Sequence, residues 1–356
     1  MWTPALGRKE KNMIKKVAII SLSRGLLGEP FISHELEIGI SRLKKYGIEV
    51  VTTENALKGM DYIKNHPEKR AKDLINALND KSIDMILCAI GGDDTYRLLP
   101  CLFENKKLEK AVKGNEKIFL GFSDTTWNHF MFNKVGFKTF YGQAFITDLC
   151  ELEDEMLPYS KKYFEELINT KTIRKIEPSD MWYEERTNFD ASQIGTKRHP
   201  HENHGFELLQ GNPVFSGKIL GGCIESIYDM FDNSRYKDTV ELCRKYNLFP
   251  SKEEWKGKIL LLESSEEKTK PDLYKKMIQK LKETGIFDVI NGILVGKPID
   301  EIYYDEYKSI LLEQVQDKNL PIVYNVNVGH ATPHCIIPFG VECTVDMNKQ
   351  NIVFNY

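Results

Sequence analysis

The chain has 356 residues, of which 41% are hydrophobic, so it can bury a large core and is long enough for two domains. Its 49 basic and 52 acidic residues give a net charge of -3, which excludes a strong positive field of the kind that holds proteins on nucleic acid or anionic membranes. The composition therefore favours a small molecule or peptide as the binding partner, with no nucleic acid and no membrane.

The N-terminal residues and the cysteines indicate the cellular compartment of the protein. The N-terminal part of the chain contains a charged stretch, and its apolar run, residues 17–22, is too short for a signal-peptide core or a membrane span. We expect residues 1–12 to form a disordered extension. The seven cysteines are scattered and never spaced as CxxC, which argues against a disulfide framework or a zinc site and fits a reducing, cytoplasmic compartment.

The first half of the chain alternates apolar runs with amphipathic stretches. A buried strand at 17–22 is followed by a helix over 34–47, and a further strand at 83–90 ends in Gly91-Gly92. Residues 117–124 (KIFLGFSD) then run from a strand into a Gly-Ser turn. This alternation predicts a mostly parallel sheet, whose ligands bind at the carboxyl ends of the strands, where both glycine loops lie.

The character of the sequence changes after residue 150. Residues 151–210 contain an acidic segment, a helix and a polar aromatic stretch without periodicity, which we interpret as an interdomain connection that partly covers a cleft. Residues 211–356 resume strands and helices, including a buried strand that ends at Glu263. The sequence thus predicts an α/β protein with a first domain at 13–150 and a second at 211–356.

Three residues have the positions that a serine hydrolase needs. A serine becomes a nucleophile when a turn exposes it beside a histidine base and backbone donors, and Ser123 follows a strand and Gly121. The motif is not the GxSxG elbow, because Thr125 stands at the second glycine, and a Ser-Asp-Thr run is also a common helix cap. Local pattern alone leaves both interpretations open.

The candidate base and acid lie in the second half. His330 follows an apolar strand and a glycine, with His334 as a rival, and either histidine could equally be structural. Glu263 ends the run KILLLE, where a carboxylate can orient a histidine or simply cap a strand.

Taken together, these motifs carry a resemblance. GGDD at 91–94, GFSDTT at 121–126, LLLES at 260–264 and GHATPHCIIPFG at 329–340 resemble, in this order, the LD-carboxypeptidase family, which includes the microcin C immunity peptidases. The likeness covers about residues 13–350. It implies a flavodoxin-like parallel-sheet domain with the nucleophile, a smaller β-rich α/β domain with the acid and base, no cofactor, and a homodimer.

The resemblance also assigns roles. It implies that Ser123 attacks an amide next to a free carboxylate, that His330 is the base and that Glu263 orients it. The backbone amides of Gly92 and Asp124 are the expected oxyanion hole.

Departures from the family pattern concern the substrate. Asp93 and Asp94 follow the glycine pair where relatives often have Tyr and a small residue, and Cys223 stands where relatives commonly have an asparagine that can meet the substrate. Trp182, in PSDMWYEE, resembles the loop tryptophan with which the microcin-immunity branch stacks on a nucleotide, although a loop tryptophan is as often an anchor. We therefore favour a peptidyl or aminoacyl nucleotide as substrate, with a muropeptide tetrapeptide as the alternative.

Three other interpretations fit parts of the sequence. GGDDT at 91–95 is similar to the GGDGT loop of NAD and lipid kinases, but Asp94 puts a negative charge where a phosphate would approach. A two-domain protein that binds a peptide or sugar without chemistry fits the fold but leaves the triad candidates unused. His199, His201 and His204 with Glu202 have the composition of a metal site, yet short His-rich loops are often only solvated, so we assign no metal.

Overall fold

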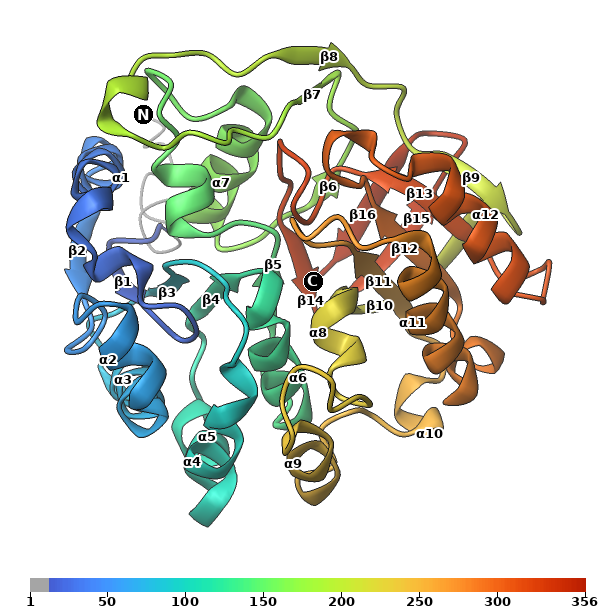
Figure 1. The fold of residues 1–356 in the computed structure, drawn as a ribbon, viewed down its shortest axis with the longest axis horizontal. Coiled ribbons are helices and arrows are strands. Elements are labelled where there is room, and N and C mark those ends of the chain that lie inside the picture. The colour runs from blue at the N-terminus through green and yellow to red at the C-terminus, as the bar shows by residue number, and fades with distance from the viewer. Residues whose placement is uncertain (1–12) are drawn as a thin grey trace, which may run out of the picture.

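The structure is a computed structural model that describes residues 13–356, and the expected disordered extension at 1–12 lies outside it. Two sheets stand side by side, each flanked by helices, with the first half of the chain around one and the second half around the other (Figure 1). This arrangement confirms the predicted α/β fold with two domains. The exact domain limits of 13–150 and 211–356 stay a prediction.

The first sheet has the strand order β14-β5-β4-β3-β1-β2. All neighbours are parallel except the outer pair of β14 and β5, which is antiparallel. The central strands are entirely buried, as expected for parallel strands covered by helices on both faces. The strands are β1 (Lys16–Ile20), β2 (Glu49–Thr52), β3 (Met85–Cys88), β4 (Ile118–Gly121), β5 (Thr139–Tyr141) and β14 (Ile337–Phe339).

Helices pack around this sheet because their apolar residues recur on one face. In α3, for example, Leu74, Ala77 and Leu78 are buried while the intervening residues meet solvent. The helices of this half are α1 (Ser33–Lys45), α2 (Met60–Asn65), α3 (Pro67–Asn79), α4 (Leu99–Phe103), α5 (Lys107–Val112), α6 (Thr126–Lys134) and α7 (Pro158–Thr170).

The second sheet has eight strands in the order β6-β16-β15-β10-β11-β12-β13-β9, so the domain expected to be the smaller carries the larger sheet. Its centre, from β10 to β13, is parallel, and its outer pairs are antiparallel. The strands are β6 (Lys175–Ile176), β9 (Glu207–Gln210), β10 (Val214–Cys223), β11 (Ile259–Glu263), β12 (Gly292–Gly296), β13 (Ile322–Val326), β15 (Glu342–Asp346) and β16 (Asn351–Asn355).

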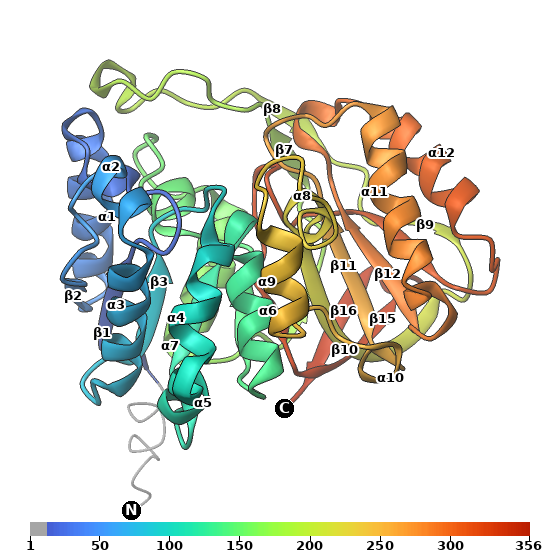
Figure 2. The same cartoon turned by 60° about the horizontal axis from the view of Figure 1, so that its bottom comes forward.

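The helices of the second half gather on the side of this sheet seen in Figure 2. The longest of them, α11, buries Tyr274, Met277, Ile278 and Leu281 at helical spacing. They are α8 (Ile224–Tyr228), α9 (Thr239–Lys245), α10 (Lys252–Trp255), α11 (Pro271–Glu283) and α12 (Tyr304–Gln314). Within residues 13–356, no helix has the length and apolar character needed to cross a bilayer.

Two features join the halves. Strand β14 comes from the C-terminal part of the chain but pairs with β5 of the first sheet, Ile337 lying opposite Tyr141. The antiparallel strands β7 (Met181–Tyr183) and β8 (Pro200–Glu202) form a separate pair, and the segment between them, residues 184–199, reaches over the first domain (Figure 2). We call this segment the strap.

Candidate active site

Ser123 begins a single 3-10 turn, Ser123–Thr125, between β4 and α6. Its φ of +63° lies in the left-handed region that side-chain-bearing residues rarely adopt, a strain often found at functional positions. Its backbone N–H donates to the hydroxyl of Tyr141 at 3.2 Å. Gly121, just before this turn, approaches β3 so closely that a Cβ there would lie 2.8 Å from the sulfur of Cys88. A tight strand end therefore presents the serine.

A continuous chain of hydrogen bonds joins Ser123, His330 and Glu263. Nε2 of His330 lies 2.9 Å from Oγ of Ser123, and Nδ1 of the same ring lies 2.7 Å from Oε2 of Glu263. The three residues are 207 and 67 positions apart in sequence. Folding thus brings together the three residues that the sequence singled out, in the order nucleophile, base, acid.

Glu263 is held in place by its surroundings at the end of β11, where it is 1% exposed. Tyr141 donates its hydroxyl hydrogen to Oε1 at 2.5 Å, so each carboxylate oxygen has a partner. Gly329 has a φ of +98°, and a Cβ on it would lie 2.5 Å from Oε2 of Glu263. Only glycine at 329 lets the loop carrying His330 come this close to the acid.

A second carboxylate, that of Glu266, also reaches the base. Its Oε2 lies 3.1 Å from Nε2 of His330, the nitrogen that faces Ser123. Burial alone would lower the pKa of His330, but the nearby charges and hydrogen bonds of Glu263 and Glu266 outweigh it and raise the pKa well above its usual value. The hydrogen bond with His330 lowers the pKa of Glu266 to about 2. The resting site therefore favours an imidazolium.

The glycine pair after β3 lies directly against the serine. A Cβ on Gly91 would be 2.6 Å from Oγ of Ser123 and 3.1 Å from the backbone nitrogen of Asp124. The missing side chain leaves the space that a reacting carbonyl oxygen would need beside that amide. Gly92 follows with a φ of +153° and lines a cavity that opens over Ser123. Asp124 directly follows the nucleophile and Gly92 lies on the cavity wall beside it, and their role as oxyanion donors stays a prediction.

The side chain of Asp124 fixes this arrangement from behind. Its Oδ2 accepts hydrogen bonds from the hydroxyls of Ser23 and Thr95 and from the backbone N–H of Thr95, at 2.5 to 2.9 Å. Three loops at the carboxyl ends of β1, β3 and β4 are tied to one buried carboxylate, 3% exposed. The side chain of Asp124 thus holds in place the turn that carries Ser123 and the backbone amide expected to be an oxyanion donor.

A cavity of about 570 Å³ opens over Ser123 and His330. This volume is within the range of small-molecule sites. Both domains and the strap line it, with Arg24 and Gly91 from the first, Arg235 and Glu266 from the second, and Phe189 from the strap. The lining includes the apolar side chains of Phe31, Ile32, Leu152 and Phe189 and the carboxyl group of Glu35, whose burial raises its pKa to about 7.

The comparison with known families gives two matches along the chain. Residues 17–142 match the LD-carboxypeptidase N-terminal domain, and residues 216–345 match the LD-carboxypeptidase C-terminal domain. The chain belongs to the LD-carboxypeptidase family. This membership makes it a serine peptidase, and hence a hydrolase, as the resemblance predicted.

Solved structures and curated relatives resemble the chain over most of its length. A microcin-immunity-like (MccF-like) protein from Streptococcus pneumoniae, solved in complex with AMP, is 61% identical, with a TM-score of 0.95 over 97% of this chain and 99% of that one. The Microcin C7 self-immunity protein MccF of Escherichia coli is 23% identical over 88% of this chain and 86% of its own length. A probable murein peptide carboxypeptidase of Bacillus subtilis is 22% identical over 90% and 86%.

Trp182, the predicted stacking residue of this LD-carboxypeptidase, lies away from the cavity lining. Its ring is 7% exposed and stacks on His201, with ring centroids 4.2 Å apart and an interplanar angle of 14°. In this conformation it anchors the β7–β8 pair, and an anchor is the second role that the sequence allows for a loop tryptophan. The strap's aromatic residue on the cavity is Phe189, which is 46% exposed. A phenylalanine in an aperiodic polar stretch carried no signal that distinguished it from Trp182.

Cys223 is also withdrawn from the cavity. It lies beside Glu263 in the register of β10 and β11, is 2% exposed, and donates its thiol hydrogen to Glu225 at 3.2 Å. Its backbone N–H donates to Thr126 at 3.0 Å. The residue that replaces the family's asparagine is therefore directed into the protein, and its predicted contact with substrate has no counterpart in this conformation.

The two aspartates after the glycine pair have different surroundings. The carboxylate of Asp94 pairs with the fully buried guanidinium of Arg70, through contacts of 2.5 and 3.2 Å, so its charge is used within the protein. Asp93 lines the cavity and accepts a hydrogen bond from Tyr236 at 2.7 Å. Neither arrangement leaves a glycine cradle for a phosphate of the kind that the GGDGT interpretation requires.

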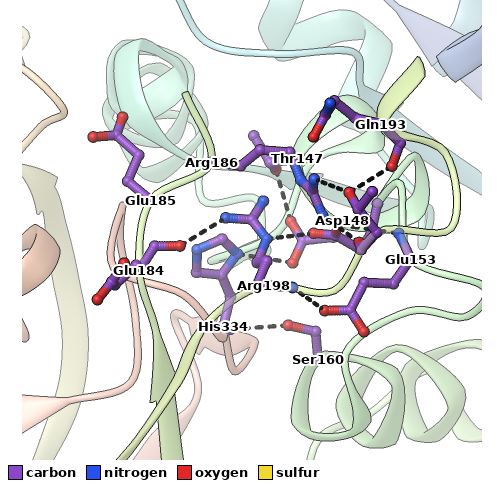
Figure 3. Close-up of polar contacts among 12 residues, drawn as sticks. Thr147, Asp148, Glu153, Ser160, Glu184, Glu185, Arg186, Gln193, Arg198 and His334 are labelled. Carbon is purple, nitrogen blue, oxygen red and sulfur yellow. Dashed lines mark hydrogen bonds and ion pairs between the residues drawn. The ribbon is translucent and has the colours of Figure 1, made fainter. Parts of the chain in front are cut away.

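The strap is fastened to the first domain by buried charges. Arg186 and Arg198 both pair with Glu151, at 3.2 and 2.6 Å, and all three side chains are less than 10% exposed. The backbone N–H of Arg198 also donates to Glu153 (Figure 3). His334, the sequence rival of His330, lies near these residues and pairs with Asp148 at 2.8 Å, 3% exposed. His334 and Asp148 thus form a separate buried pair, and the histidine hydrogen-bonded to Ser123 is His330.

Proposed function

We propose that this serine peptidase hydrolyses an amide bond through a triad of Ser123, His330 and Glu263, and that its substrate is an aminoacyl or peptidyl nucleotide. The observation that carries the catalytic part is the unbroken hydrogen-bond chain from Oγ of Ser123 to the carboxylate of Glu263, with Gly91 leaving room beside the amide of Asp124. This geometry matches the needs of acyl transfer.

In the first half-reaction, Oγ of Ser123 attacks the carbonyl carbon while Nε2 of neutral His330 takes the hydroxyl proton. The carbonyl oxygen becomes an oxyanion and accepts hydrogen bonds from the amides of Asp124 and Gly92. The C–N bond then breaks, the imidazolium gives its proton to the leaving nitrogen, and the acyl group remains on Ser123 as an ester.

In the second half-reaction, His330 takes a proton from a water molecule that attacks the ester, and the acid is released as Ser123 regains its proton. Glu263 holds Nδ1 of the ring throughout and stabilises the imidazolium formed in each half. Because its other oxygen is bonded to Tyr141, the carboxylate keeps one orientation. Glu266 lies on the opposite nitrogen and must yield that position to the substrate's reacting groups.

Three observations support a nucleotide in the substrate. The 61% identical protein from Streptococcus pneumoniae was solved with AMP. Phe189 presents an exposed ring to the cavity, and stacking of a base on an aromatic ring contributes about 1 to 3 kcal/mol. Arg24, exposed beside the glycine pair, puts a positive charge on the cavity wall, where it can bind a phosphate.

A muropeptide tetrapeptide that loses its terminal D-alanine is the second candidate. The similarity to the probable murein peptide carboxypeptidase of Bacillus subtilis supports it, as does Arg24, since a guanidinium binds a free carboxylate as readily as a phosphate. The ring of Phe189 has no partner in such a substrate, and for this reason we favour the nucleotide.

The test offers both substrates to the enzyme side by side. Aspartyl sulfamoyl adenosine, which a structure of MccF contains, and a muropeptide tetrapeptide are each incubated with wild type, Ser123→Ala and the exposed-serine control Ser309→Ala, and products are quantified by mass spectrometry. We expect release of the amino acid from the nucleotide analogue, lowered at least about 10⁴-fold by Ser123→Ala and unchanged by Ser309→Ala.

A third variant assigns the binding contribution of the strap. Phe189→Ala should raise KM for the nucleotide analogue about 5- to 150-fold, as expected for the loss of about 1 to 3 kcal/mol of stacking, whereas Phe189→Tyr should leave KM unchanged. Turnover of the tetrapeptide alone would select the cell-wall reaction. Turnover that Ser123→Ala does not affect would refute the triad.

A further inference from the structure

The β7–β8 pair presents four side chains on one face. In the register, Trp182 lies opposite His201, and the backbone N–H of Glu184 donates to the carbonyl of His199 at 3.0 Å, which puts these two residues opposite each other. Residues two apart in a strand point to the same side, so Trp182 and Glu184 share a face with His201 and His199. This face bears two imidazoles and a carboxylate at the base of the strap.

The three potential ligand atoms converge on one point. Nδ1 of His199 and Nε2 of His201 are 3.1 Å apart, and they lie 3.1 and 2.9 Å from the same oxygen, Oε1, of Glu184. In a tetrahedral zinc site with bonds of about 2.0 to 2.1 Å, neighbouring ligand atoms are about 3.3 Å apart. An ion above this triangle would meet all three atoms after shifts of a few tenths of an ångström.

We propose that Glu184, His199 and His201 form a binding site for a divalent first-row metal ion, for which Zn²⁺ is the best match. Two imidazoles and one carboxylate suit zinc, whereas magnesium and calcium prefer oxygen ligands alone. Three protein ligands leave a fourth position for water, and the partial exposure of the three side chains gives the ion access. The assignment of no metal from the sequence is thereby revised.

Trp182 makes this site more ordered than an ordinary pair of surface histidines. The indole stacks on the ring of His201 and is itself buried against the protein, which restricts the orientation of Nε2. Such support lowers the entropy cost of ordering ligands when the ion binds. The buried tryptophan thus has a function that does not involve the substrate.

The ligand set differs from the one that the sequence suggested. His199 and His201 are included, but Glu202 alternates to the other side of β8 from His201, and Glu184 from the neighbouring strand takes its place. His204 lies beyond the end of β8 and is not one of the three converging residues. Because Glu184 is distant from His199 in the sequence, the sequence alone did not show that the two residues belong to one ligand set.

A bound ion would cross-link the two ends of the strap. Glu184 and His199 are its two ends, and between them lie Arg186, Phe189 and Arg198, all on the cavity wall. The backbone pairing of β7 and β8 already joins these ends, and a bound ion would add a side-chain cross-link that stabilises this pairing and keeps the strap ordered over the cavity. None of the three ligands lines the cavity itself, which assigns the ion a structural role.

The test is titration of the full chain, freed of any affinity tag and dialysed against a chelator, with ZnCl₂ by isothermal calorimetry. We expect one Zn²⁺ per chain, with affinity lowered at least about tenfold in each of Glu184→Gln, His199→Gln and His201→Gln. A visible absorption band with Co²⁺, lost in the same variants, would independently report the nitrogen ligands.

Two variants control for zinc bound elsewhere. His204→Gln removes a histidine close to His201 in the sequence, and His330→Gln removes one of the two histidines that line the cavity; both variants should bind Zn²⁺ as wild type does. The inference is overturned if wild type takes up no zinc, or if the double variant His199→Gln/His201→Gln binds it equally well. Because no substrate is present, this result does not depend on the proposed function.

Discussion

His330 has a carboxylate at each ring nitrogen, Glu263 at Nδ1 and Glu266 at Nε2. A general base must be neutral to accept a proton, yet these two negative charges favour the imidazolium and raise the pKa of the ring although it is buried. Activity should therefore rise with pH as His330 loses its proton. In the proposed mechanism Glu263 orients the ring at Nδ1, whereas Glu266 contributes its charge and a hydrogen bond at Nε2, so the two contributions can be separated.

Glu266→Gln is expected to move the acid limb of the kcat/KM profile to lower pH. Removing the negative charge at Nε2 destabilises the imidazolium, which lowers the pKa of His330 and makes the neutral base available at lower pH. The measurement is kcat/KM against pH for wild type and variant.

The neighbouring residue provides the matched control. Glu267 also lines the cavity but pairs with Arg235 at 2.7 Å and not with the imidazole. Glu267→Gln should leave the acid limb where it is. An unchanged limb in Glu266→Gln, or an equal displacement in both variants, would contradict the account of His330.

At the scale of elements, α3 holds the glycine loop beside the nucleophile. Arg70 of α3 is fully buried, binds the carboxylate of Asp94 and donates to the carbonyls of Leu22 and Ser23, so one side chain ties the loops after β1 and β3. The oxyanion space depends on this connection because Gly91 lies three residues before Asp94.

Arg70→Met should lower the free energy of unfolding by about 3 kcal/mol, because it leaves a buried carboxylate without its main partner. Arg97→Met is the control, since Arg97 contacts the same carboxylate at 3.2 Å but is 35% exposed, and exposed pairs contribute at most about 1 kcal/mol. Urea unfolding of both variants measures the difference. Equal, small losses would show that the buried pair does not hold the loop.

The strands and the triad were accessible from the sequence for a physical reason. Parallel strands buried on both faces appear as apolar runs, and the residues at their carboxyl ends, Ser123 and Glu263, can be located by counting to the end of each run. His330 followed from its glycine and from the family resemblance. Periodicity and end position are local signals that locate these residues, whereas their roles were assigned by the family resemblance.

Other parts of the site depend on long-range contacts that no local pattern encodes. The partnership of Tyr141 with Glu263 spans 122 positions, and the buried pair of Arg70 and Asp94 spans 24. Phe189 lies on the cavity wall, where the sequence led us to expect Trp182. Which of the two rings faces the cavity depends on the path of the strap, and an aperiodic sequence does not predict that path. The metal ligands Glu184 and His199 become neighbours only through strand pairing.

For the whole molecule, the site depends on the contact between domains. The first domain supplies Ser123, and the second supplies His330 and Glu263, while β14 and the bond from Tyr141 to Glu263 link the two. All of these residues belong to one chain. The homodimer expected from the family resemblance stays a prediction, and the geometry does not require it for catalysis.

Activity per chain is therefore expected to stay constant on dilution. If the enzyme is a homodimer, kcat should be unchanged at concentrations where light scattering shows it to dissociate, since each chain holds a complete triad. Loss of kcat in step with dissociation, with the chains still folded by circular dichroism, would mean that a partner chain completes the site.

The most direct test of the triad needs no knowledge of the substrate. An alkyl fluorophosphonate reacts with serines that a neighbouring base activates, and mass spectrometry of digested protein locates the adduct. We expect one adduct per chain, on Ser123, formed at least about 100-fold more slowly in His330→Ala. An adduct on another serine, or a labelling rate that His330→Ala leaves unchanged, would contradict the assignment of Ser123 and His330 as nucleophile and base.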